Sequence, residues 1–135
     1  MKFSIITVCY NSQKTLAQAL DSVARQKYPS VEHILVDGGS SDSTVEIIRS
    51  KESPALRWIS EPDRGIYQAM NKGLALARGE VVAMLNSDDV YADQDVLGQV
   101  ARVFEQDRPD AVYGDLVYVD PSDPERIRRY WKTGI

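Results

Sequence analysis

The chain has 135 residues, about one domain's worth, and its hydrophobic content of 43% supports a buried core and argues against disorder. Its formal net charge is −4, from 16 basic and 20 acidic residues, which argues against nucleic-acid binding by bulk electrostatics. A single cysteine, Cys9, excludes an intrachain disulfide, and neither a membrane-spanning apolar run nor a signal-peptide pattern is present, so we expect a cytoplasmic protein.

Five apolar segments predict β-strands that alternate with helices. The predicted strands are residues 3–9, 31–36, 56–60, 80–85 and 111–119. Such alternation calls for a mostly parallel sheet with right-handed crossovers. The predicted fold class is therefore α/β, with a Rossmann-like, mostly parallel sheet and helices on both faces.

Four predicted helices connect or follow these strands. We expect Asn11 or Ser12 to cap the first helix, and Ser43 with Glu46 to form a capping box on the second. The third spans residues 66–78 and stops at Gly79, with an inward face made of Met70, Leu74 and Ala77. The fourth begins after Asp93 and carries apolar residues from Val96 to Phe104.

Polar and glycine-rich residues follow four of the predicted strands. These segments are residues 7–11, 37–41, 63–65 and 86–89. Ligands of parallel sheets bind beyond the carboxyl ends of the strands, so we expect the four loops to meet at one ligand-binding edge. Cys9 and His33 lie within strands, and we interpret both as buried structural residues.

Two adjacent carboxylates, Asp88 and Asp89, come after the strand of residues 80–85 and are preceded by Asn86 and Ser87. Like charges this close repel each other, and a divalent cation that takes oxygen ligands and substrate phosphates would offset the repulsion. The alternative is a polar loop that caps the next helix. From these four residues alone, both interpretations stay open.

Two other loops have the same ambiguity. The glycines after Asp37 let the backbone approach a ligand, and the Asp37 carboxylate can accept a hydrogen bond from a base or sugar. Arg64 can hold a phosphate or carboxylate, while Asp63 orients it or binds a sugar hydroxyl. A tight turn and two capped helix starts would explain the same residues.

The last ten residues are basic and aromatic. They contain Arg126, Arg128, Arg129 and Lys132, with Tyr130 and Trp131 and no acid. Such a segment can touch an anionic membrane surface, which would place the protein at the inner membrane face as a peripheral protein. We favour the alternative of a solvated strand or helix.

Five segments together resemble family 2 glycosyltransferases, which are inverting enzymes with the nucleotide-binding GT-A fold, and in particular bacterial members of polysaccharide biosynthesis. The segments are residues 5–11, 36–44, 61–73, 77–80 and 85–89. Each is weak alone, and their order and spacing make the resemblance specific. A phosphoacceptor receiver domain is disfavoured because Tyr10 and Asn11 stand where it needs an acidic pair, and an oxidoreductase because no glycine fingerprint is present.

The resemblance implies a donor site and a metal site. The implied donor-binding residues are Thr7, Tyr10, Asn11, Asp37, Gly38, Asp63, Arg64, Asn86 and Ser87. Among them, Thr7, Tyr10 and Asp37 would line the nucleobase pocket, and Asp63 and Arg64 would approach the diphosphate or sugar. Asn86 stands at the first position of the D-x-D motif, so Asp88, with Asp89 second, is the implied ligand of Mg²⁺ or Mn²⁺.

The implied activity is inverting transfer of a sugar from a nucleoside diphosphate donor, expected to be a UDP-sugar, to a saccharide or lipid-linked acceptor. Catalytic domains of this family are longer, so we expect residues 1–135 to be one nucleotide-sugar-binding domain truncated at its C-terminus, with the catalytic base beyond Ile135. The alternative is a non-catalytic nucleotide-sugar-binding module, completed by self-association into a homodimer through an exposed sheet edge.

Overall fold

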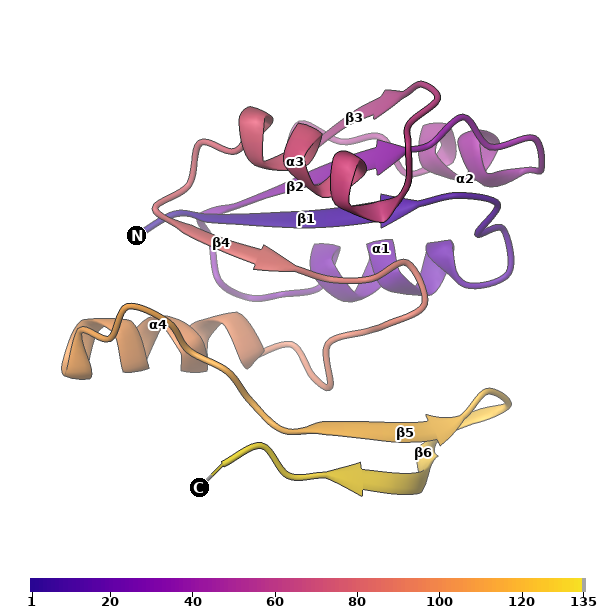
Figure 1. The fold of residues 1–135 in the computed structure, drawn as a ribbon. Coiled ribbons are helices and arrows are strands. Elements are labelled where there is room, and N and C mark those ends of the chain that lie inside the picture. The colour runs from indigo at the N-terminus through magenta and orange to yellow at the C-terminus, as the bar shows by residue number, and fades with distance from the viewer. Residues whose placement is uncertain (135) are drawn as a thin grey trace. The chain divides into compact units, whose positions relative to one another are not determined.

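The structure, a computed structural model, describes residues 1–134 and contains two compact units, Met1–Gln99 and Val100–Ile135 (Figure 1). The first unit holds a four-stranded parallel sheet in the order β3-β2-β1-β4. Its strands are β1 (Phe3–Cys9), β2 (Val31–Asp37), β3 (Leu56–Ser60) and β4 (Val81–Met84). The predicted α/β class with a parallel sheet is confirmed, and the four strands differ from their predicted bounds by no more than a residue at either end.

Helices cover both faces of this sheet, as predicted. They are α1 (Leu16–Ala24), α2 (Thr44–Ser50) and α3 (Ile66–Leu76), and Figure 1 shows α3 in front of the sheet with α1 and α2 behind it. Alternate strand residues serve the two faces, because successive side chains of a strand point in opposite directions. Leu35 packs with Leu16 and Ile48 on the α1–α2 face, whereas Ile34 packs with Ala69 on the α3 face.

The predicted helix caps were wrong. Thr15 precedes α1 without a side-chain cap, and Asn11 lies further upstream with a left-handed φ of 48°. Ser43 precedes α2 but its side chain also makes no capping bond; the Asp42 carboxylate accepts a hydrogen bond from the Thr44 amide instead, at 2.9 Å. The side chains of Asn11 and Ser12 bond instead to residues of other loops.

Helix α3 ends earlier than predicted, and a different face of it is buried. It stops at Leu76, and the extended backbone of Ala77 leads toward β4. Leu74, predicted to face inward, is 45% exposed, while Ala69 and Gly73 are buried. Small residues line this contact because the helix lies close to β1: a Cβ atom on Gly73 would come within 2.5 Å of the Ile6 side chain.

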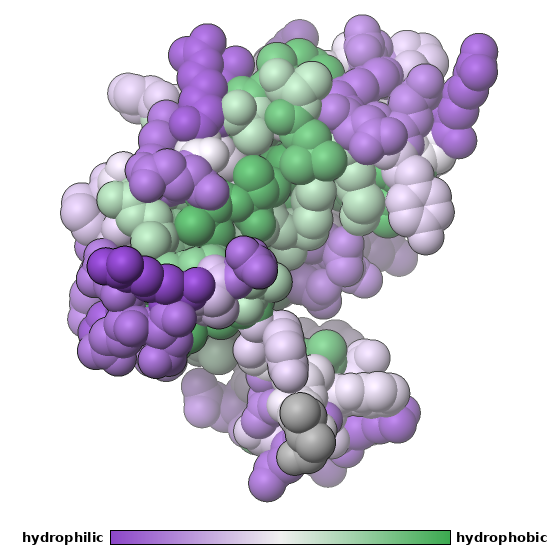
Figure 2. Space-filling view, turned by 60° about the vertical axis from the view of Figure 1, so that its left-hand side comes forward, coloured by the Kyte–Doolittle hydropathy of each residue, from purple (hydrophilic) through white to green (hydrophobic). Residues whose placement is uncertain are grey.

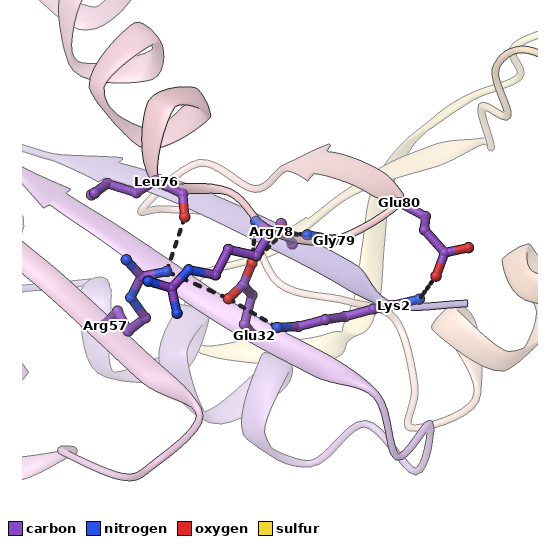
Figure 3. Close-up of polar contacts among 8 residues, drawn as sticks. Lys2, Glu32, Arg57, Leu76, Arg78, Gly79 and Glu80 are labelled. Carbon is purple, nitrogen blue, oxygen red and sulfur yellow. Dashed lines mark hydrogen bonds and ion pairs between the residues drawn. The ribbon is translucent and has the colours of Figure 1, made fainter.

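A buried carboxylate joins the elements at the amino end of the sheet (Figure 3). Glu32 of β2 accepts hydrogen bonds from the Ser4 hydroxyl at 2.6 Å, the Arg78 amide at 2.7 Å and the Lys2 ammonium at 3.2 Å. Burial acts to raise the pKa of Glu32, but these hydrogen bonds and the Lys2 charge outweigh it and lower the pKa to about 2. We refer to this arrangement of Lys2, Ser4, Glu32 and the Arg78 amide as the Glu32 cluster.

Gly79 completes the connection between α3 and β4. Its amide donates to the Ser4 hydroxyl at 2.8 Å, and a Cβ atom at this position would lie 2.7 Å from both the Lys2 carbonyl oxygen and the Ser4 nitrogen. The backbone thus passes too close to β1 for any other residue. Arg57 adds a bond to the Leu76 carbonyl at 2.9 Å, which holds the end of α3.

The edge strand β4 leaves apolar side chains exposed in the first unit. Val82 and Met84 are 40% and 42% exposed, and by their register with Ser4 and Ile6 they share the sheet face that α3 covers. A space-filling view shows apolar side chains gathered on one face of the molecule, bordered by hydrophilic ones (Figure 2). Exposed apolar surface beside an unpaired strand edge is typical of an interaction surface.

The second unit contains an antiparallel hairpin. Helix α4 (Val96–Asp107) leads into β5 (Leu116–Asp120), which pairs with β6 (Asp123–Trp131). The segment 111–119 was predicted as a fifth strand of the main sheet; the structure begins this strand at Leu116 and pairs it with β6 in a separate two-stranded sheet. The basic residues of the last ten lie largely on the exposed strand β6, as the favoured alternative expects.

Among the described residues, no helix is both long and apolar enough to cross a bilayer.

Candidate functional site

An open pocket of about 620 Å³ lies at the carboxyl edge of the parallel sheet, within the first unit. Its walls come from the loops after β1, β2 and β4 and from the start of α3. The lining residues are Val8, Asn11, Ser12, Gln13, Lys14, Thr15, Asp42, Ile66, Asn86, Ser87 and Asp88. The predicted convergence of loops at this edge is therefore present in the structure.

Asn11 joins the β1–α1 loop to the β2–α2 loop. Its side-chain oxygen accepts hydrogen bonds from the backbone amides of Ser41 at 2.9 Å and Asp42 at 3.3 Å, while its backbone N–H donates to the Ser40 hydroxyl at 2.8 Å. Asparagine tolerates the left-handed backbone better than most residues, so one residue supplies both the turn and the contact between the loops. Asn11 lines the pocket and also holds its shape.

Asp37, at the end of β2, is fully buried beneath the β2–α2 loop. Its carboxylate accepts hydrogen bonds from the amides of Gly39 at 3.1 Å and Ser40 at 3.0 Å, and from the hydroxyls of Ser40 and Ser60. Burial acts to raise the pKa of Asp37, but these donors outweigh it and hold the pKa below its ordinary value. The carboxylate is thus fully engaged in folding the loop.

Asp42 and Gln13 bring the same two loops together at the pocket wall. The backbone N–H of Gln13 donates to the Asp42 carboxylate at 3.3 Å, and the Gln13 side-chain oxygen accepts from the backbone N–H of Ser43 at 3.1 Å. Burial acts to raise the pKa of Asp42, yet hydrogen bonds from Thr44 lower it. Neither residue was predicted as a site residue, although both lie within two residues of Asn11 or Ser43, where the loop motifs placed the polar side chains.

The turn of residues 86–89 follows β4. The Asn86 side-chain amide donates to the Asp89 carboxylate at 3.0 Å, and the Asp89 amide donates to the Asn86 carbonyl at 3.1 Å. The hydroxyl of Ser87 lies 3.0 Å from that of Ser12, which links the turn to the β1–α1 loop. Asp88 lines the pocket and Asp89 does not.

The acidic turn fits a cation that a phosphorylated ligand helps to bind. Within residues 1–134, no group of three or more His, Cys, Asp or Glu side chains is placed to hold a metal ion by itself. Mg²⁺ commonly takes one or two protein carboxylates and completes its coordination with water and substrate phosphates. The donor set of Asp88 and Asp89, beside a pocket large enough for a ligand, matches that mode of binding.

The predicted site residues fall into two groups. Four of the predicted donor or metal residues line the pocket: Asn11, Asn86, Ser87 and Asp88. Tyr10 is 63% exposed and Arg64 is also exposed, and neither lines the pocket. Gly38 and Asp63 pack against each other: a Cβ atom on Gly38 would lie 2.9 Å from an Asp63 carboxylate oxygen.

Thr7 is placed differently from the position that the resemblance implies. Its side chain is fully buried and lies 2.8 Å from the His33 ring nitrogen Nε2, so it has no exposed surface at the pocket. His33 itself is buried, which lowers its pKa to about 4 and keeps the ring neutral. Cys9 is buried as expected, and burial together with the Asp37 charge raises the pKa of its thiol.

Several pocket residues were missed from the sequence. They are Val8, Ser12, Gln13, Lys14, Thr15, Asp42 and Ile66. Ser12, Gln13, Lys14 and Thr15 directly follow the motif that ends at Asn11, and the chain needs these residues to reach α1. Their place in the connection was the available signal, and interpreting Ser12 as a possible helix cap drew attention away from it.

Comparisons with known proteins agree with this architecture. The family model Glycosyl transferase family 2 matches residues 4–134. The chain is 39% identical over 119 residues to the PGL/p-HBAD biosynthesis glycosyltransferase of Mycobacterium bovis BCG, covering 85% of this chain and 46% of that protein. It is 40% identical over 97 residues to an uncharacterized glycosyltransferase of Mycobacterium tuberculosis, covering 71% of this chain and 37% of the relative.

Solved structures show the same fold. Staphylococcus aureus TarS in complex with UDP-GlcNAc has a TM-score of 0.72 and 31% identity, covering 82% of this chain and 33% of TarS. Mannosyltransferase PcManGT of Pyrobaculum calidifontis in complex with GDP-Man and Mn²⁺ has a TM-score of 0.73 and 26% identity, covering 92% of this chain and 37% of that enzyme. The chain spans less than half the length of each of these proteins. On the match to residues 4–134, the chain belongs to glycosyltransferase family 2, and its fold is that of the GT-A glycosyltransferases.

Proposed function

We propose that this chain binds the nucleoside diphosphate of a sugar donor and supplies the donor-binding part of a family 2 glycosyltransferase. The observation that carries the proposal is the pocket of about 620 Å³ at the carboxyl edge, walled by three loops and bordered by Asp88. The structures of TarS in complex with UDP-GlcNAc and of PcManGT in complex with GDP-Man support a nucleotide-sugar ligand for this chain as well.

We assign the predicted donor residues to two kinds of work. Asn11, Asn86 and Ser87 line the pocket and would contact the donor, and exposed Tyr10 would offer its ring to the nucleobase. Asp37 and Gly38 would act through loop shape, because the Asp37 carboxylate already accepts hydrogen bonds from its own loop. Asp63, packed against Gly38, would orient the approach of Arg64 toward the sugar or diphosphate.

Asp88 and Asp89 would hold Mg²⁺ or Mn²⁺ together with the diphosphate. When bound, such a cation supplies positive charge that stabilises the departing nucleoside diphosphate. Asn86 contributes an amide where the family motif has a carboxylate, so this chain offers one negative charge fewer to the cation. The Asn86–Asp89 hydrogen bond of 3.0 Å would orient the Asp89 carboxylate for this task.

The reaction we propose is a single in-line displacement with inversion. An acceptor hydroxyl attacks the anomeric carbon, its proton passes to a carboxylate base, and the bond to the nucleoside diphosphate oxygen breaks. The acceptor would be a saccharide or a lipid-linked saccharide, which is consistent with a cytoplasmic protein that touches the inner membrane face.

A non-catalytic nucleotide-sugar-binding module is the second candidate, and two observations favour it. Within the second unit, Asp120 accepts hydrogen bonds from Arg128 and Ser122, and Asp115 accepts from Tyr130 and Thr133, so both carboxylates are engaged. In the first unit, the exposed side chains of Val82 and Met84 beside the β4 edge would support a homodimer. Sugar transfer by the 135-residue chain with a defined donor and acceptor would exclude this candidate.

Titration calorimetry with UDP and GDP tests the donor proposal. We expect the wild-type chain to bind one of them in MgCl₂ or MnCl₂ and to lose most of that affinity in EDTA. Asp88→Asn should lower the affinity in the presence of metal, while Asp110→Asn, an exposed Asp-to-Asn change outside the pocket, should leave it unchanged. Full, metal-independent affinity in Asp88→Asn would exclude the metal assignment, and binding of neither nucleotide by the wild type would overturn the proposed function.

A further inference from the structure

Lys14 is the one basic side chain that lines the pocket among the described residues. The other lining residues are acidic, polar or apolar, and the two acids are Asp42 and Asp88. Arg64, the residue expected to grip a phosphate, is exposed and does not line the pocket. Lys14 is therefore the positively charged side chain that a ligand with two phosphates would contact in this pocket.

The ammonium group of Lys14 is uncommitted in the structure. Across residues 1–134, none of the ion pairs includes it. Lys72 differs in this respect, because its ammonium pairs with Glu61 at 2.9 Å and donates to the Pro62 carbonyl at 3.2 Å. Lys14 can thus bind an anion without first giving up a partner.

A second, independent feature adds positive potential at the same wall. Lys14 lies two residues before α1, a helix of nine residues with no side-chain cap and no acidic residue in its first turn. The aligned peptide dipoles at a helix start favour anions. The backbone amides of Gln13, Thr15 and Leu16 themselves already donate, to the Asp42 carboxylate and the Ser12 carbonyl. The adjoining Gln13 and Thr15 also line the pocket, so the amino end of α1 borders the same space as Lys14.

We propose that Lys14, together with the amino end of α1, forms the phosphate-contacting wall of the donor pocket and binds the diphosphate directly. This assignment rests on the proposed donor function and names the group that recognises its phosphates. Asp88, from the loop after β4, holds the acidic side of the same pocket. The diphosphate would then be bound directly by a lysine of the loop after β1 and, through Mg²⁺ or Mn²⁺, by the acidic turn after β4, so both loops must keep their places for binding.

A series of nucleotides separates phosphate recognition from the rest of binding. The full 135-residue chain is titrated in MgCl₂ with uridine, UMP and UDP, and with guanosine, GMP and GDP, using calorimetry for the nucleotides and NMR shifts for the weakly bound nucleosides. We expect Lys14→Gln to lose about 10- to 100-fold in affinity for the diphosphate, the range of one hydrogen bond to a charged group. Its affinity for the nucleoside should stay within about twofold, because a nucleoside carries no phosphate for the lysine to contact.

Two further variants serve as controls. Lys14→Arg keeps the charge and should retain most of the diphosphate affinity. Lys27→Gln removes the same charge from an exposed lysine outside the pocket and should bind like the wild type. Unchanged diphosphate affinity in Lys14→Gln, or equal losses for nucleoside and diphosphate, would overturn the inference, while failure of the wild type to bind any member of either series would instead overturn the donor function.

Discussion

Glu32 at the amino edge of the parallel sheet and the pair Asp88 and Asp89 at its carboxyl edge have opposite environments. At the amino edge, the buried Glu32 carboxylate accepts hydrogen bonds from a hydroxyl, an amide and an ammonium group. At the carboxyl edge, Asp88 and Asp89 are exposed on a turn beside an open pocket. Glu32 belongs to a closed, satisfied network that holds elements together, as Asp37 does at the carboxyl edge, whereas Asp88 and Asp89 leave charge available to a ligand.

The segments that resemble the family lie at both edges of the sheet. The motif of residues 77–80 belongs to the amino edge, where the Arg78 and Gly79 amides bind Glu32 and Ser4. The motifs that end at Asn11 and at Asp89 belong to the carboxyl edge and reach the pocket. The motif of residues 77–80 is therefore structural, whereas those that end at Asn11 and Asp89 line the pocket.

The largest effect is expected from Gly79→Ala at the amino edge. The added Cβ atom would lie 2.7 Å from backbone atoms of Lys2 and Ser4, which cannot move away as a flexible side chain can. We expect a loss of about 2–4 kcal/mol in the free energy of unfolding, measured by urea denaturation. Gly98→Ala is the matched control, because nothing lies within 4 Å of the new Cβ atom and alanine favours the helix. Similar stability in both variants would contradict the close contact at Gly79.

The Glu32 carboxylate at the amino edge predicts a pH dependence of stability. Its pKa is lowered to about 2 in the folded chain, against 4.5 for the ordinary group. The stabilisation is therefore fully present above pH 4.5 and is lost as the pH falls through 4.5 toward 2. Allowing for solvent screening at this edge, we expect a contribution of about 1–2 kcal/mol.

The measurement compares wild type with Glu32→Gln in urea denaturation from pH 7 to pH 2. The variant should be less stable at neutral pH and should show a flatter decline in acid. Glu80→Gln, whose side chain is 72% exposed, serves as the control and should follow the wild-type curve. Parallel curves for wild type and Glu32→Gln would mean that Glu32 titrates as an ordinary surface group.

Features set by local sequence were predicted, whereas features set by contacts between residues far apart in the sequence were not. The strands β1 to β4 were predictable because each is rich in apolar residues, and their carboxyl ends led to the pocket edge. The Glu32 cluster was not, since a glutamate in a strand gives no local sign that Ser4 and Arg78 lie beside it. For the same reason β5 was misplaced, because its partner β6 is set by pairing and not by its own pattern.

Residues of the site show the same limit. Asn11 and Asp88 were predicted from motifs, whereas Lys14 carries no motif and was found only when the folded loops surrounded it. The place of Thr7 in a motif likewise gives no information on which way its side chain points, and the structure buries it beside His33.

Asn11 allows the carboxyl edge to be weakened without touching the amino edge. Asn11→Ala removes the acceptor for the Ser41 and Asp42 amides and places alanine at a φ of 48°. We expect about 1–2 kcal/mol of lost stability and a clear loss of nucleotide affinity, because the two loops that wall the pocket come apart. Asn11→Gly keeps the backbone and loses the acceptor, so it should recover part of the stability but not the affinity. Full nucleotide affinity in Asn11→Gly would show that the loop contact is dispensable for the pocket.

The smallest expected effect comes from Ser87→Ala, which tests how the acidic turn is held. The Ser12 and Ser87 hydroxyls lie 3.0 Å apart and form a side-chain contact between the first loop and the turn after β4. Because this contact is part-exposed, its removal should cost about 0.5 kcal/mol of stability.

If the contact positions Asp88, its removal should also weaken the Mg²⁺-dependent binding of the diphosphate and leave nucleoside binding unchanged. Ser12→Ala should then behave like Ser87→Ala, and the double variant should add little, since either change alone already removes the contact. Additive losses in the double variant would mean that the two hydroxyls act separately and that the turn keeps its place through its own Asn86–Asp89 hydrogen bonds.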